Sequence, residues 1–145
     1  MFKHPNYSPN EKLKVYLEML ALTKQAVTAG NNSVLDATFF SEELRTKFRQ
    51  GIAGKARILF IEIVAFEPLI QQRVQRKRVS SDADWGIYKQ IKNQWEPIIE
   101  EHLILESTDS NISQMLGIAA DYCLANDQRA NRQINSERDL SGQSE

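Results

Sequence analysis

Hydrophobic residues recur at helical spacing near the start of the chain. The residues at this spacing are Leu13, Tyr16, Leu17, Leu20 and Val27. Ser8 and Pro9 are typical of a helix start, Glu11 completes a capping box, and Gly30 is a typical terminator. The pattern therefore predicts a helix from about residue 8 to residue 29, with its apolar side in the core.

Three apolar segments further along the chain predict strands. Residues 57–64 are almost continuously apolar, which favours a strand covered on both faces, as in a parallel sheet. Residues 102–106 form a shorter segment, and residues 33–40 follow a Gly-Asn-Asn turn and predict a short buried strand that runs into a loop. Further helices are predicted to start near Ser41, Glu67, Asp82 or Asp84, and Asn111. The alternation predicts an α/β fold with parallel crossovers.

Composition narrows the class of protein. The 145 residues are 41% hydrophobic, which suits one domain, and the balance of 18 basic and 19 acidic residues argues against a general nucleic-acid coat. Cys123 is the single cysteine, so no internal disulfide is expected. The sequence has no apolar run of the ~20 residues that a membrane span needs. We expect a cytoplasmic domain over residues 1–125, with a polar, disordered tail over residues 126–145.

A basic cluster between Arg73 and Arg78 is one candidate site. Four of its six residues are cationic, in a chain whose formal net charge is -1. Arginine forks match phosphate oxygens, and Arg73 lies within one helical turn of Arg76 and Lys77, so the cluster is suited to an anion. The other interpretation is a solvated helix end whose cations interact with the helix dipole.

Asp36 is the second candidate, because it interrupts an apolar segment that is predicted to be a strand. A carboxylate there is costly unless it is paired, lies at a strand end or binds a cation. It could equally cap the next helix or accept hydrogen bonds from backbone amides. The aromatic residues between Trp85 and Trp95 are more typical of packing than of base stacking. The sequence contains neither a Walker A loop nor a nucleophile elbow.

Five motifs follow one another along the chain: Tyr7-Ser-Pro-Asn-Glu11, Val34-Leu-Asp-Ala-Thr-Phe39, Arg73/Arg76/Arg78 with Ser81-Asp-Ala-Asp84, Trp95-Glu-Pro97 and His102-Leu-Ile-Leu-Glu-Ser-Thr108. In this order they resemble the motifs of predicted P-loop kinase-like ATP-binding proteins related to polynucleotide kinase and zeta toxin. The resemblance covers about residues 1–125. It implies part of a P-loop NTPase-type three-layer sandwich with a mostly parallel sheet and a helical lid at about residues 73–84.

The resemblance also implies roles for single residues. Asp36 would be a catalytic carboxylate near Mg²⁺, acting through water, with Thr38 as a polar neighbour. Arg73, Arg76 and Arg78 would close over the phosphates, because phosphoryl transfer needs charge neutralisation. The implied ligands are ATP, Mg²⁺ and a phosphate acceptor that the sequence does not name.

The chain departs from this family pattern at its start, where the first two strands and the Walker A loop are absent. One hypothesis is therefore the C-terminal part of an ATP-dependent phosphotransferase, truncated and inactive without that loop. The alternative is a non-catalytic phosphate-binding, nucleotide-binding or partner-dependent module, and a third, less favoured, is an interaction protein that uses Trp85 and Trp95. The missing central strand would leave a gap that self-association, a partner chain or direct pairing of the flanking strands would fill.

Overall fold

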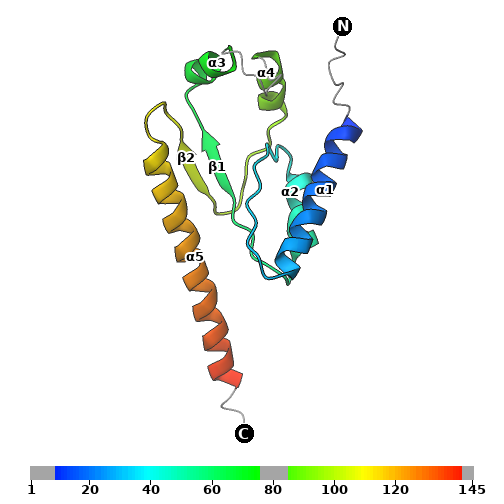
Figure 1. The fold of residues 1–145 in the computed structure, drawn as a ribbon, viewed down its shortest axis with the longest axis vertical. Coiled ribbons are helices and arrows are strands. Elements are labelled where there is room, and N and C mark those ends of the chain that lie inside the picture. The colour runs from blue at the N-terminus through cyan, green and yellow to red at the C-terminus, as the bar shows by residue number, and fades with distance from the viewer. Residues whose placement is uncertain (1–8, 76–84, 142–145) are drawn as a thin grey trace. The chain divides into compact units, whose positions relative to one another are not determined.

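The chain is divided into two compact units. The computed structural model describes residues 9–75 and 85–141 (Figure 1). Within these ranges, the first unit contains residues 9–58 and 91–97, and we call it the helical unit. The second unit contains residues 59–75, 85–90 and 98–141, and we call it the strand unit.

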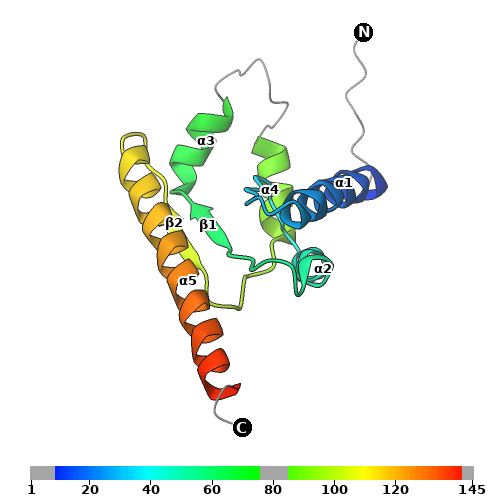
Figure 2. The same ribbon diagram turned by 60° about the horizontal axis from the view of Figure 1, so that its bottom comes forward.

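The helical unit is built on α1 (Pro9–Thr28) and α2 (Glu42–Ile52), which lie side by side in Figures 1 and 2. Both helices begin as predicted, and the Ser41 side chain accepts a hydrogen bond from the backbone N–H of Leu44 at 3.3 Å. The buried apolar residues are Tyr16, Leu20, Leu44, Phe48 and Ile52. Burial of these side chains is the main contribution that holds the two helices together.

Gly51 lies inside α2, which continues to Ile52. A Cβ atom at Gly51 would lie 2.9 Å from Cδ1 of Leu20, which is closer than real contacts allow. The glycine is therefore explained by the close approach of α1 to α2 and not by helix termination.

The strand unit contains β1 (Ile61–Val64) and β2 (Leu103–Glu106), which form a parallel pair. The α-helix α5 (Ile112–Ser141) runs beside β2 in both views (Figures 1 and 2), and its Met115 is buried like Leu105 of β2. Both segments were predicted to be strands of a mostly parallel sheet, and their parallel direction agrees with that prediction. The unit also contains α3 (Glu67–Gln75) and the first residues of α4 (Trp85–Gln94), whose last four residues belong to the helical unit.

The predicted strand within residues 33–40 is wrong. Residues 31–40 have no strand in the structure, and the side chain of Val34 is 97% exposed. An extended segment becomes a strand only when a neighbouring strand takes its backbone hydrogen bonds, and the sheet of the described residues consists of β1 and β2 alone. The mixture of helices and parallel strands is compatible with an α/β fold, whereas the three-layer sandwich stays a prediction.

The last helix is longer than the sequence analysis expected. Disorder was expected from residue 126, but α5 continues to Ser141. Residues 126–141 contain neither glycine nor proline and include several strong helix formers, so nothing in them stops a helix that is already formed. None of the helices in the two described ranges has the length and apolar character that crossing a membrane requires.

A histidine connects the two strands. In its protonated form, His102 donates from Nδ1 to the backbone carbonyl of Glu100 (2.7 Å) and from Nε2 to the carboxylate of Glu62 on β1 (3.1 Å). The bond to the Glu100 carbonyl raises the pKa of His102 above its ordinary value of 6.5, partial burial opposes this, and Glu62 raises the pKa further. The charged imidazole therefore favours the folded state.

We expect this pair to make stability depend on pH. The contribution of His102 is fully present below pH 6.5, where the histidine of the unfolded chain is also protonated, and is lost as the pH rises through the higher pKa of the folded state. Urea unfolding between about pH 5.5 and about pH 8 should therefore show stability falling across this window. The variant His102→Gln should lose that part of the slope, and an unchanged slope would contradict the assignment.

Candidate functional site

The loop between α1 and α2, residues 29–41, carries Asp36 and Thr38. Its end is fixed by Tyr16 of α1, whose hydroxyl accepts from the backbone N–H of Phe39 (3.2 Å) and lies 3.0 Å from Oγ1 of Thr38. Phe39 has φ +40°, which is uncommon for a residue other than glycine. The phenylalanine ring stacks at an angle on Tyr16, with ring centroids 5.3 Å apart. Side-chain packing and hydrogen bonding therefore hold this unusual backbone conformation.

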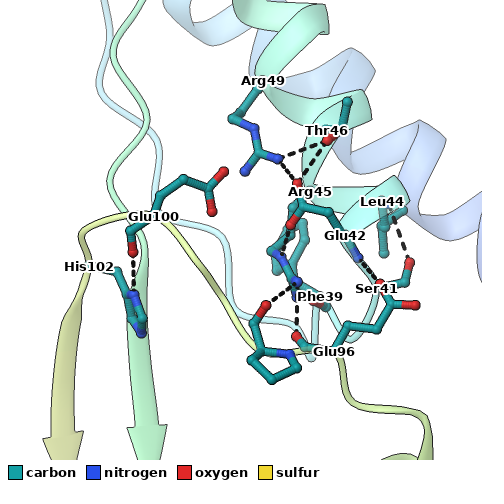
Figure 3. A network of polar contacts seen from close by, with 11 residues as sticks. Phe39, Ser41, Glu42, Leu44, Arg45, Thr46, Arg49, Glu96, Glu100 and His102 are labelled. Carbon is teal, nitrogen blue, oxygen red and sulfur yellow. Dashed lines mark hydrogen bonds and ion pairs between the residues drawn. The ribbon is translucent and has the colours of Figure 1, made fainter.

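Arg45 of α2 connects the loop to the chain that follows α4 (Figure 3). Its side chain is 0% exposed. Nη1 donates to the carbonyl of Phe39 at 2.8 Å, and Nη2 donates to the carbonyls of Glu96 and Pro97 at 2.9 and 3.1 Å. Nε pairs with the carboxylate of Glu42 at 3.1 Å. One buried guanidinium thus joins α2, the loop and residues 96–97.

Glu42 stays ionised beside Arg45. Partial desolvation raises the pKa of Glu42, but hydrogen bonds from Thr46, Arg45 and Arg49 together outweigh it, so the pKa lies below its ordinary value. Figure 3 shows these three donors around the carboxylate. The charge that balances Arg45 is therefore present at neutral pH.

A partly open hollow of about 280 Å³ lies against this loop, within the helical unit. It is lined by Lys12, Val15, Tyr16 and Met19 of α1, by Asp36, Ala37, Thr38 and Phe40 of the loop, and by Ile91 and Gln94 of α4. The structure therefore places Asp36 and Thr38 in the same hollow. The Asp36 side chain is exposed and has no hydrogen-bond or ion-pair partner among the described residues. The predicted buried carboxylate is thus an accessible one.

The residues around Asp36 fit a magnesium site that nucleotide phosphates and water complete, but not one made of protein ligands alone. In residues 9–75 and 85–141, no group of three or more histidine, cysteine, aspartate or glutamate side chains is placed to hold a metal ion. Magnesium, however, is commonly held by nucleotide phosphates and water, with only one or two carboxylates from the protein. The accessible Asp36, with the hydroxyl of Thr38 in the same hollow, fits a water-mediated contact to such an ion.

Arg73, the first cation of the basic cluster, lies in the strand unit near the end of α3. Nη1 donates to Oγ of Ser107 at 3.0 Å, and Nη2 pairs with the carboxylate of Asp109 at 3.2 Å. Three quarters of its side chain is buried, so it is not a solvated helix end. Arg76 and Arg78, the other arginines of the predicted lid, lie outside the described residues.

Sequence reasoning missed three residues of the helical unit. Tyr16 was assigned to the core, which is correct, but its hydroxyl also fixes the loop. Lys12 was not singled out, although it lines the hollow. The sequence pattern shows Arg45 only as a neighbour of Leu44 in an amphipathic helix. Its burial could not be predicted, because the carbonyls that it contacts lie up to 52 residues away.

In a comparison with protein-family models, residues 2–98 match the model described as "AAA domain". The match covers more than half of the chain and includes Asp36, Thr38 and the whole basic cluster. No curated protein and no solved structure matches the chain.

Proposed function

Because the chain belongs to the AAA domain family, a P-loop kinase-like family of nucleotide-binding proteins, we propose that it forms part of an ATP-dependent phosphotransferase. The observation that carries the proposal is the accessible, unpaired Asp36, which lies with Thr38 in one hollow inside the matched residues. The loop is fixed by Tyr16 and Arg45, and such preorganisation favours a site in which charge must be held in a defined place.

Asp36 has an electrostatic role in this proposal. Magnesium, when bound with ATP, neutralises negative charge on the phosphates. Asp36 would accept hydrogen bonds from water on that ion, and Thr38 would be its polar neighbour. Asp36 has no direct partner among the described residues, which supports this role, because no contact there has to break first.

Arg73 is proposed as a phosphate contact that first has to release Asp109. The Asp109 carboxylate is 59% exposed, and ion pairs of this kind are worth at most about 1 kcal/mol. A phosphate group can replace such a carboxylate, because it carries a higher charge and its oxygens accept two parallel hydrogen bonds from one guanidinium. The proposal extends to Arg76 and Arg78 on the resemblance alone.

In this proposal the phosphate-binding loop is supplied from outside these 145 residues, which contain no Gly-rich loop of the Walker A type. We propose that the same segment, or a partner chain, also pairs with the edge of β1 that does not face β2. Among the described residues β1 pairs with β2 alone, which leaves one edge of the strand for such a contact.

The test uses the natural protein purified from its source. Its mass and sequence are determined, its binding of MgATP is measured by calorimetry, and its ATP turnover is assayed with candidate acceptors. Turnover by a protein that contains these residues would support the phosphotransferase. Binding without turnover would favour the alternative, a non-catalytic nucleotide-binding module. A natural protein that does not bind MgATP would overturn both.

A further inference from the structure

The hollow beside Asp36 has the composition of a small-molecule site. Its lining is mainly apolar, from residues such as Val15, Met19 and Ile91, with a few polar groups among them. Its volume of about 280 Å³ is close to the lower end of ligand sites, roughly 300–1,000 Å³. The hollow therefore suits a compact organic molecule better than a complete nucleotide.

Two side chains of opposite charge, one on α1 and one on the loop after it, line this hollow. Lys12 comes from α1, and Asp36 comes from the loop that follows the same helix. Neither side chain has a hydrogen-bond or ion-pair partner in the part of the chain that the structure describes, and Lys12 is half-buried. An ammonium and a carboxylate that are both unpaired beside one apolar surface can each pair with a different group of one ligand.

The walls of the hollow are fixed before any ligand binds. Tyr16 lines it and is held in the core by Phe39 and Phe48, with ring centroids 5.3 and 6.4 Å away. The end of the loop that carries Asp36 is fixed by the Phe39 contacts to Tyr16 and Arg45. A preformed site loses less conformational entropy on binding, which favours even a small ligand.

We propose that this hollow binds the phosphate acceptor, a small molecule with an apolar body, a hydroxyl group that donates to Asp36 and an anionic group that pairs with Lys12. The assignment of the ligand as acceptor rests on the proposed phosphotransferase function. Binding itself requires no nucleotide, so it can be tested separately.

The test compares two probes of almost the same shape, 4-hydroxybenzoate and the neutral 4-hydroxybenzyl alcohol, titrated into the isotope-labelled chain and followed by NMR. Both probes should shift the methyl signals of Val15, Met19 and Ile91. Lys12→Gln should weaken binding of 4-hydroxybenzoate by about tenfold, the size expected for one charge-assisted contact, and leave the neutral probe unchanged. Asp36→Ala should weaken both probes.

The matched control is Lys14→Gln, since Lys14 lies on the same helix, is exposed and does not line the hollow. It should change the binding of neither probe. The proposal is overturned if the hollow residues do not shift, or if the variants at Lys12 and Lys14 have equal effects. Probe binding without MgATP binding in the natural protein would refute the phosphotransferase alone, whereas ATP turnover without probe binding would refute this inference alone.

Discussion

Replacement of Arg45 by alanine is expected to destabilise the helical unit by about 3 to 5 kcal/mol, the usual cost of removing one partner from a buried charged network. The change removes the donors to the carbonyls of Phe39, Glu96 and Pro97, and it leaves Glu42 without one of its ion pairs. The lost volume adds to this cost, because the guanidinium is completely buried next to the aromatic core.

Urea unfolding of the purified chain measures this cost. Lys47→Ala is the matched control, since Lys47 is a partly exposed cation on the same helix that pairs, within the described ranges, only with Glu43 one turn away. Its removal should cost less than about 0.5 kcal/mol. Arg45→Lys should fall between the two, because an ammonium keeps the charge but cannot reproduce the forked contacts. If the variants at Arg45 and Lys47 unfold at the same urea concentration, the network does not stabilise the unit as argued.

The helices and the two strand segments could be predicted because the apolar pattern that marks them is local. The apolar spacing along α1 and the cap at Ser41 are local signals, and both are confirmed. The segment at Val34 has an equally good strand pattern, but a strand needs a neighbour, and the sequence pattern says nothing about whether one is available. Likewise, polar composition predicted disorder after residue 126, whereas the absence of helix-breaking residues lets α5 continue.

The candidate site was predictable in its residue types but not in its contacts. Asp36 was selected because a carboxylate in a buried strand is costly, yet the structure leaves it exposed in a loop, so the residue is of interest for its accessibility. Arg73 meets Asp109, which lies 36 residues later in the chain, and Arg45 meets carbonyls more than 50 residues later. Every residue has a backbone carbonyl, so the residue pattern does not indicate which carbonyls accept a hydrogen bond. Buried donors of this kind are therefore found only in the folded structure.

The second large effect is expected at Asp36. Under the proposed function, Asp36→Asn should lower kcat for ATP-dependent transfer by 10- to 100-fold, the usual loss when a residue that orients metal-bound water is removed. The stability of the chain should hardly change, because the carboxylate is exposed and has no partner among the described residues.

The measurement is the steady-state rate of the natural protein with saturating MgATP, with urea unfolding done in parallel. Asp121→Asn is the control, because Asp121 is an exposed carboxylate on α5 outside the hollow, and its removal should leave kcat unchanged. The amide of asparagine has nearly the shape of the carboxylate, so a lower rate with unchanged stability assigns the loss to charge at this position. A variant at Asp36 that keeps the full rate would mean that the accessible carboxylate does not contact the magnesium shell, and it would remove the central residue of the proposed site.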